Sequence, residues 1–445
     1  MSHAPIPRGA IIGIVGNGPF GRMIAHAARE VGYRTWVFGP GADSPAGQTA
    51  DRQFDAAYSD ADAFGEFLNG ADVITFGCRQ VPQECLTGLP SSKPIHPSPE
   101  ILLLTQNPLH ERNWLLDRGF PIPDFISVRS RAELDDALEF IGTPAILRPC
   151  DGQGSTGEPM GEDLDAAWLA MGCDEAILEA HVESRLNLST CCTRSSLGET
   201  RCFPVCENIF DREALVISRA PAEISPDLAQ KTQALALQIA QSARIVGTMT
   251  IELTLVGEDT LLIDRFSAAP HASGQLSIDA YSSSLFKHHV LAITGRPLPK
   301  VDQREPAMMV SLLGTLWDQE PPPFDALMAL PGARLHIYGE TESRPRREMG
   351  HLTVVGEVAP HVMESLHRLA LEQSFYPPQP PSAAEVITGR LAQRPFQPFS
   401  ISLSDGRTLL IDEAGALATL RHIFVHQSTD GSVTQFKPDD IRAIS

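Results

Sequence analysis

The chain has 445 residues, a hydrophobic fraction of 42% and a formal net charge of −20 at pH 7. This length predicts more than one domain, at roughly 100–200 residues each. The acidic balance argues against sequence-independent binding to nucleic acid or to an anionic membrane, because both require a basic surface. No apolar run approaches the ~20 residues of a membrane span, and the first residues lack the form of a signal peptide. We therefore expect a cytoplasmic protein that binds neither nucleic acid nor membranes.

The first region of the chain shows a β-turn-α-β pattern over residues 10–39. The apolar strand AIIGIVG is followed by the turn GNGPFG, by a helix with apolar residues at helical spacing, and by the strand TWVFG. Gly16, Gly18 and Gly21 fit the GxGxxG pattern, which points a helix N-terminus at a bound group. A nicotinamide site is not expected, because Gly39 stands near the position of the usual acid. The glycines predict either a tight turn or a phosphate or substrate contact.

The central region continues with alternating strands and helices, among them the strands ADVITFG, IPDFISV, PAILRPC and EAILEAHV. Helices are expected over residues 226–244 and 278–293, from their apolar periodicity. A glycine-rich loop, residues 150–157, follows Arg148. Such a loop either folds over phosphates through backbone N–H groups or is a mobile surface loop. The eight cysteines form no CxxC pair, so we expect buried free thiols.

Residues 249–274 are predicted to form two strands joined by a turn, with Glu252 on the first strand and Asp264 at the end of the second. A carboxylate among apolar neighbours must be paired or bind a metal, because an isolated buried charge is very costly. Two carboxylates on paired strands suit Mg²⁺. Arg265, however, follows Asp264 directly, and an ion pair between Glu252 and Arg265 is the alternative to a metal. Since adjacent strand residues face opposite sides, Asp264 and Arg265 are expected not to point at one site.

The last part of the chain begins with short strands and a helix over residues 306–374, followed by a proline-rich segment. Beyond it, Asp405-Gly406 and Asp430-Gly431 predict hairpin turns between alternating strands. A β-module this short makes a thin core, so we expect it to dock on a partner or on the main body.

Eight segments, taken together and in order, resemble 5-(carboxyamino)imidazole ribonucleotide synthase, a purine-biosynthesis enzyme of the ATP-grasp superfamily. They are GNGPFGRM, DSPAGQTAD, HPSPE, PAILR, ILEAHV, PVCEN, PHASGQLSIDA and RPRREMGHLTV. The resemblance implies an α/β and α+β multidomain protein. Its parts are a Rossmann-like pre-ATP-grasp domain (1–104), an ATP-grasp domain (105–300), a small C-terminal subdomain (301–375), a proline-rich linker (376–386) and an appended small β-module (387–445) that lies outside the family.

The activity implied by the resemblance is that of a carbon–nitrogen ligase. The family uses Mg-ATP and bicarbonate to make carboxyphosphate, and then carboxylates the exocyclic amine of 5-aminoimidazole ribonucleotide. Its members are commonly dimers, so a homodimer is implied as well.

Site residues are implied residue by residue. The implied ATP site consists of Arg148 at the position of a phosphate-binding lysine, the loop residues Asp151, Gly152 and Gly154, and the strand Glu179–Val182, whose backbone would bind adenine. The implied metal ligands are Glu252 and Asp264. The ribonucleotide would contact Gly18, Phe20, His271, Ser273, Arg344 and Arg347, of which the two arginines are alternatively a solvated basic face. His351 is expected to be structural rather than catalytic.

Several positions depart from the family pattern. Arg148 replaces a lysine, the glycine loop is short, and Pro108 stands where the family has an arginine. Other family residues are replaced by Asn187, Phe210 and Arg265. Arginine and lysine are not interchangeable at a tight phosphate site, and Arg265 opposes a metal ion. A second hypothesis therefore stays open: a catalytically impaired homologue that acts as a ligand-sensing or scaffold protein, with the β-module as its partner-binding end.

Overall fold

The computed structural model describes most of the chain, which divides into two compact units, residues 1–358 with 366–375 and residues 359–365 with 376–445. The described residues are 4–78, 81–87, 89–90, 92–150, 167–169, 172, 174–211, 214–318, 322–358, 360–372, 387, 390–391, 397–412, 417–420, 423–427, 433–436 and 440–444.

The first unit begins with a parallel four-stranded sheet in the order β3-β2-β1-β4. Its elements are β1 (Ile11–Val15), α1 (Pro19–Glu30), β2 (Arg34–Phe38), β3 (Arg52–Phe54), α2 (Ala61–Gly70) and β4 (Val73–Phe76). The predicted β-turn-α-β unit over residues 10–39 is confirmed. Buried residues of α1, such as Ile24 and Ala28, pack on the apolar strands.

The three glycines of the first turn have different reasons to be glycine. Gly16 has φ +105°, and a Cβ on Gly21 would lie 2.5 Å from the carbonyl oxygen of Gly16. Turn geometry and close helix–strand packing therefore require both. A Cβ on Gly18, in contrast, would meet nothing within 4 Å. Packing does not explain Gly18, and the space in front of it is open.

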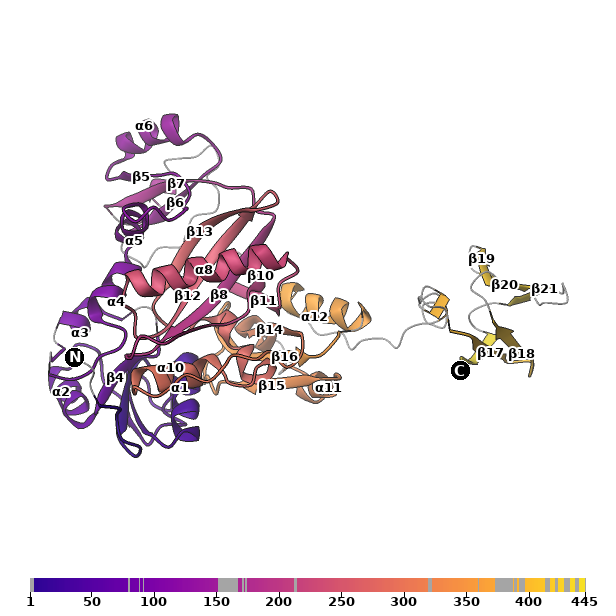
Figure 1. Ribbon diagram of the computed structural model, residues 1–445, viewed down its shortest axis with the longest axis horizontal. Helices are drawn as coiled ribbons and strands as arrows, with labels where there is room; N and C mark the ends of the chain where they lie inside the picture. Colours follow the sequence, from indigo (N-terminus) through magenta and orange to yellow (C-terminus); the bar gives the residue numbers. More distant parts are fainter. Residues whose placement is uncertain are drawn as a thin grey trace. The chain divides into compact units, whose positions relative to one another are not determined.

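A small antiparallel sheet follows, in the order β5-β7-β6, with α6 packed against it (Figure 1). Its elements are β5 (Phe125–Val128), α6 (Arg131–Ile141), β6 (Ala145–Pro149) and β7 (Ala176–Ala180). The glycine loop from residue 151 onward lies outside the described residues.

The largest sheet has nine strands, in the order β13-β12-β8-β10-β11-β14-β16-β15, with β9 beside β8. They are β8 (Leu186–Arg194), β9 (Thr200–Cys202), β10 (Cys206–Asp211), β11 (Ala214–Ala220), β12 (Gly247–Val256), β13 (Thr260–Ser267), β14 (Ala307–Leu313), β15 (Ala333–Ile337) and β16 (Glu348–Val355). The predicted hairpin is β12–β13. Because β14 pairs with β11, this sheet continues across residue 300, and the domain boundaries stay a prediction.

Helices cover these sheets and connect them; α8 lies along the large sheet in Figure 1. The helical segments are α3 (Gln83–Thr87), α4 (Pro99–Gln106), α5 (Pro108–Leu116), α8 (Pro226–Ser242), η1 (Ala272–Gly274), α9 (Ser277–Ala280), α10 (Leu285–Ile293), η2 (Gly314–Trp317), α11 (Phe324–Met328) and α12 (Pro360–Glu372). The expected single helix over 278–293 is wrong. Tyr281 bridges to Gln303 after α9, and Ser284 caps the N-terminus of α10 by accepting the N–H of Lys287.

The second unit contains two three-stranded antiparallel sheets, β18-β17-β22 and β19-β20-β21. Their strands are β17 (Phe399–Leu403), β18 (Thr408–Ile411), β19 (Leu417–Leu420), β20 (Ile423–Gln427), β21 (Val433–Phe436) and β22 (Ile441–Ile444). The predicted turn at Asp405-Gly406 joins β17 to β18, with Gly406 at φ +89°. Asp430-Gly431 and the linker 376–386 lie outside the described residues. Among the described residues of this unit, a small cluster of apolar side chains that includes Phe399 and Ile411 forms a core.

Two further sequence-based expectations concern membranes and thiols. Within the part of the chain that the structure describes, no helix is long and apolar enough to cross a membrane. The seven described cysteines form no disulfide with one another; Cys78 and Cys202 are half-buried, and the expected burial is confirmed for the other five.

A buried chain of hydrogen bonds ties the N-terminal sheet to the large sheet through His289 on α10. The backbone N–H of Thr248 donates to Nδ1 of His289 (3.1 Å), so Nε2 carries the proton toward Oγ1 of Thr75 at 2.7 Å. Thr75 in turn donates to the carbonyl of His96. These contacts require a neutral imidazole. Burial accordingly lowers the pKa of His289 to about 3, and that of the neighbouring His288 to about 4.

Acid should therefore destabilise the fold well above the pH at which carboxylates titrate. Below about pH 6.5 both histidines are protonated in the unfolded chain but stay neutral in the folded one. The free energy of unfolding therefore falls by up to about 1.4 kcal/mol per pH unit for each of His288 and His289 as the pH is lowered. Between pH 7 and pH 5 the free energy of unfolding should therefore fall by about 2 kcal/mol less in His289→Gln than in the wild-type chain. Denaturant unfolding at both pH values measures this. The exposed His110→Gln is the control, and equal losses in the two variants would contradict the assignment.

Candidate functional site

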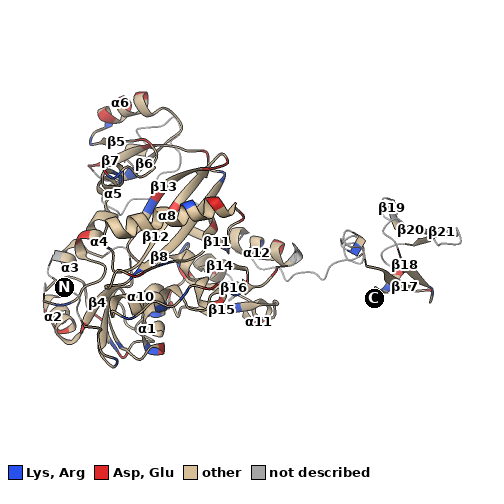
Figure 2. Cartoon of the chain, viewed as in Figure 1, with Lys and Arg blue, Asp and Glu red and all other residues tan. Residues whose placement is uncertain are grey.

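The hairpin β12–β13 carries a β-bulge at the predicted metal site. Glu252 faces Arg265 across the pair, but the next residue, Leu253, faces Ile263, so Asp264 is an extra residue in β13. Nε of Arg265 lies 3.3 Å from Oε2 of Glu252 and 3.4 Å from Oδ2 of Asp264. In Figure 2 a red, acidic stretch and a blue, basic stretch lie next to each other on β13. The expectation that Asp264 and Arg265 do not point at one site is therefore wrong, because strict alternation fails at a bulge.

Arginines from two other elements complete the cluster. Nη2 of Arg148, on β6, lies 2.8 Å from Oδ1 of Asp264. Nε of Arg148 donates to Glu179 on β7, whose side chain is 2% exposed. Glu179 also accepts from Arg112 on α5, and Arg112 donates to the backbone carbonyl of Asp264.

We call these six residues the ionic network: Arg112, Arg148, Glu179, Glu252, Asp264 and Arg265. It connects the small sheet, α5 and the large sheet.

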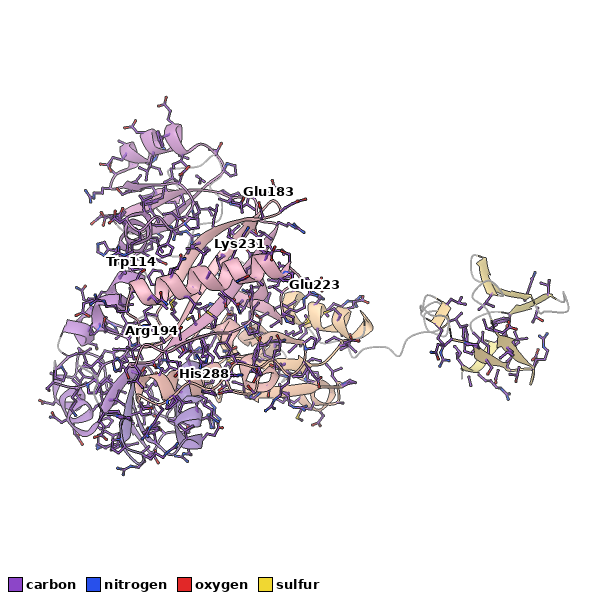
Figure 3. The ribbon with its side chains drawn as sticks, viewed as in Figure 1. Trp114, Glu183, Arg194, Glu223, Lys231 and His288 are labelled. Carbon is purple, nitrogen blue, oxygen red and sulfur yellow. The ribbon has the colours of Figure 1, made fainter. Side chains whose placement is uncertain are left out.

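Arg112 was missed in the sequence analysis, although a signal was present. The resemblance placed an arginine at the position of Pro108, and Arg112 lies four residues later. Residues four apart lie on the same face of a helix, so the side chain of Arg112 can reach the region that the family arginine at position 108 would contact. Trp114 anchors the same helix, with its ring 5.4 Å from Phe266 on β13 (Figure 3). Glu111 accepts the backbone N–H of Phe266 at 2.5 Å.

The surrounding charges determine the protonation states in the network. Burial alone would raise the pKa of Asp264, but Arg148, followed by Arg265 and Arg112, holds it well below its usual range. Glu252, followed by Asp264, raises the pKa of Arg265 against the opposing effect of burial. Both side chains are therefore charged over the whole physiological range of pH.

The predicted ribonucleotide residues His271 and Ser273 lie against this network. Nε2 of His271 is 3.2 Å from Oε1 of Glu252, and its Nδ1 is 3.0 Å from the hydroxyl of Ser273. Two residues further on, Nε2 of the buried Gln275 donates to Oε2 of Glu348 (3.3 Å). Glu348 follows Arg347 directly, so the segment of His271 and the segment of Arg347 are in contact. Burial raises the pKa of Glu348.

The donor set of Glu252 and Asp264 does not fit Mg²⁺. Each carboxylate oxygen already faces a guanidinium or an imidazole: the two of Glu252 face His271 and Arg265, and the two of Asp264 face Arg148 and Arg265. Mg²⁺ requires near-octahedral oxygen ligands at about 2.0–2.1 Å, and here a fixed cation lies between its two expected ligands. The alternative, an ion pair of Glu252 with Arg265, is the arrangement that the structure contains.

The other implied ATP residues lie on or beyond β7. Glu179 uses its side chain for two ion pairs, as described above. The backbone N–H groups of Ala180 and His181 donate to the carbonyls of Asp124 and Pro144. Val182 is half-buried on the connection to β8, next to Glu183, which Figure 3 labels. The loop residues Asp151, Gly152 and Gly154 lie outside the described residues.

The remaining implied ribonucleotide residues come from α1 and the β15–β16 loop. Gly18 is the N-cap of α1, and Phe20 stacks on Phe286 with ring centroids 6.5 Å apart. Arg344 pairs with Glu342 at 2.6 Å and its side chain is 63% exposed. Arg347 pairs with Glu340 at 3.3 Å and is 32% exposed.

Three protein families match successive parts of this chain. Residues 10–106 match the ribonucleotide synthetase preATP-grasp domain, residues 114–286 the ATP-grasp domain, and residues 307–365 the phosphoribosylaminoimidazole carboxylase C-terminal domain. The β-module lies beyond the last matched residue.

Relatives of known name agree with these matches. N5-carboxyaminoimidazole ribonucleotide synthase of Bacillus subtilis is 33% identical over 360 residues, which cover 79% of this chain and 93% of the relative. A solved N5-carboxyaminoimidazole ribonucleotide synthetase in complex with ADP has 31% identity and a TM-score of 0.77, and covers 84% of this chain and 100% of its own. The Staphylococcus aureus N5-carboxyaminoimidazole synthetase, also solved with ADP, has 29% identity and a TM-score of 0.76, covering 82% and 98%. The chain belongs to the N5-carboxyaminoimidazole ribonucleotide synthase family of ATP-grasp ligases.

Proposed function

We propose that this chain is an ATP-dependent ligase that carboxylates 5-aminoimidazole ribonucleotide with bicarbonate. Bicarbonate attacks the γ-phosphorus of ATP and releases ADP, and the exocyclic amine then attacks the carbon of carboxyphosphate and releases phosphate. The observation that carries this proposal is the match to all three domains of the family over 93% of a relative's length. ATP, bicarbonate and the ribonucleotide are its proposed partners.

We propose that the nucleotide binds between the small and large sheets. Adenine would bind at the end of β7, from Val182 onward, because the N–H groups of Ala180 and His181 are already used. The phosphates would meet the guanidinium groups of Arg148 and Arg265 together with the loop of Asp151, Gly152 and Gly154. Arginine recognises phosphate oxygens through paired N–H groups. We assign no step to magnesium at Glu252 and Asp264.

We propose that the ribonucleotide binds at the turn of Gly18 and Phe20, next to the segments that contain His271 and Arg347. Open space in front of Gly18 supports this placement, because a phosphate can approach the N-terminus of α1 there. The contact between Gln275 and Glu348 supports it as well, since it holds the two other segments together. Arg344 and Arg347 would contribute bidentate contacts to the 5′-phosphate.

One observation favours the second candidate function, a homologue that binds ligands without the family chemistry. Arg265 neutralises the carboxylates that would hold the metal. A charge pair 4 Å apart is worth about 4 kcal/mol near a protein surface, so a guanidinium in place of a carboxylate beside Mg²⁺ removes several kcal/mol of metal binding. In this candidate the β-module, residues 387–445, is the partner-binding end.

Phosphate release from ATP distinguishes the two candidates. We expect the purified full chain to release phosphate only when both bicarbonate and aminoimidazole ribonucleotide are present, and Glu252→Gln to abolish the release, because Glu252 holds both His271 and Arg265. Glu258→Gln, exposed in the turn of the same hairpin, is the matched control and should keep the wild-type rate. Absence of release under every combination, together with absence of ATP binding in calorimetric titration, would favour the non-catalytic candidate.

The ion pairs of Arg265 generate a prediction about magnesium. Arg265→Glu leaves three carboxylates together, so we expect the free energy of unfolding to fall by about 3 kcal/mol, as for other broken buried pairs. Millimolar Mg²⁺ should restore much of this loss in the variant and leave the wild-type chain unchanged. Denaturant unfolding with and without Mg²⁺ measures both effects. Arg201→Gln, which breaks a pair with Glu199 at β9 of the same sheet without adding a carboxylate, should show no rescue; an equal Mg²⁺ response in the two variants would argue against a metal site masked by Arg265.

A further inference from the structure

A second group of chemically capable side chains lies outside the ionic network. Asp279 on α9, His336 on β15 and His351 on β16 bring one potential ligand atom each to positions within 4.8 Å of one another. His336 and His351 are direct partners on antiparallel strands, so their side chains lie on the same face of the sheet. The helix α9 packs against β16 and brings Asp279 to that face.

His351 is arranged as a ligating histidine usually is. Its side chain is fully buried, and its Nδ1 lies 2.7 Å from the hydroxyl of Tyr338. Among the residues that the structure describes, Nε2 of His351 has no hydrogen-bond partner. Ligating histidines typically use one ring nitrogen for the metal and the other for an outer hydrogen bond. A buried nitrogen without a partner is costly, and a cation at this position would remove that cost.

His336 and Asp279 supply the other two donors. Nε2 of His336 lies 2.8 Å from Oδ2 of Asp279, a hydrogen bond that a metal ion bound to both atoms would replace. The rings of His336 and His351 are stacked, with centroids 4.4 Å apart and planes 13° apart. Since a metal–nitrogen bond lies in the ring plane, one ring must turn for both to bind. His336 is the ring that would turn, because its side chain is 31% exposed whereas His351 is fully buried.

A cavity of about 420 Å³ reaches this cluster at His336. His336 and Tyr338 lie in its wall, as do Ile278, next to Asp279, and Arg22 and His26 from α1. Arg22 donates to the carbonyl of Pro45 and to Gln48, both at 3.0 Å. The cavity provides an entry path for an ion and room for water or a small ligand at a fourth position.

We propose that Asp279, His336 and His351 form a site for one divalent transition-metal ion, with Zn²⁺ as the best match. Two imidazoles, one carboxylate and an open fourth position are a donor set that zinc binds tetrahedrally, at about 2.0–2.2 Å. Hard ions such as Mg²⁺ and Ca²⁺ favour oxygen ligands instead. The metal proposal does not rest on the proposed ligase chemistry.

The test is calorimetric titration of the metal-free full chain with Zn²⁺, together with the visible absorption of the Co²⁺-loaded chain. We expect one Zn²⁺ per chain with micromolar or tighter affinity, and a tetrahedral Co²⁺ spectrum. His336→Gln should weaken binding at least tenfold and remove that spectrum, and Asp279→Asn should weaken binding as well. His26→Gln, in the same cavity wall but outside the cluster, is the matched control and should bind within twofold of wild type.

His336→Gln changes a partly exposed side chain, so this variant keeps the test valid if Asp279→Asn fails to fold; circular dichroism and thermal unfolding verify the fold. Unchanged Zn²⁺ affinity in folded His336→Gln would overturn the proposal, because the ion would then be bound elsewhere, for example by the thiols. Absence of Zn²⁺ binding by the wild-type chain would overturn it too.

Discussion

The guanidinium of Arg265 lies between the carboxylates of Glu252 and Asp264, and the rest of the site is arranged around this contact. Each acid also contacts a second partner, His271 for Glu252 and Arg148 for Asp264. These side chains are mostly buried, where unpaired charges are expensive, so each group stabilises the ionised form of its neighbour. Charge that the family resemblance would assign to a metal ion is supplied by arginine.

The same network holds separate parts of the chain in position. Through Glu179, Arg148 and Arg112 it connects the small sheet and α5 to β13. Through His271 it continues to η1, and Gln275 then contacts Glu348 at the start of β16. The proposed nucleotide and ribonucleotide positions are thus connected through His271 and the short helix η1. A change at Arg265 is therefore expected to affect both positions.

Much of the fold could be predicted because its signals are local. The apolar runs and glycines of residues 10–39 define a β-turn-α-β unit, and the hairpin of Glu252 and Asp264 follows from alternating apolar residues around a turn. Predictions failed where a single irregular residue decided the geometry. Asp264 is inserted as a bulge, which reverses the facing of its neighbour. Ser284 caps α10, which divides a segment whose apolar periodicity alone indicates one helix.

The candidate site was predicted in part. One connected cluster contains six of the implied site residues, Arg148, Glu179, Glu252, Asp264, His271 and Ser273. The family resemblance divides them among ATP, metal and ribonucleotide positions. Arg112 was missed, since its role depends on a helix face that only packing orients. The cluster of Asp279, His336 and His351 was missed for a similar reason, because its residues come from three separate elements. From the sequence, His351 was expected to have only a structural role.

The amino-acid sequence by itself determined the family, the order of the domains and the presence of an arginine beside the expected metal ligands, because these depend on residue identity and spacing along the chain. Only the tertiary structure decided which charges meet. Ion pairs depend on distances of a few ångströms between segments far apart in sequence, and on the burial that makes those distances matter. Arg148 and Asp264 are 116 positions apart, yet their side chains lie 2.8 Å apart because the fold brings β6 of the small sheet close to the bulge in β13.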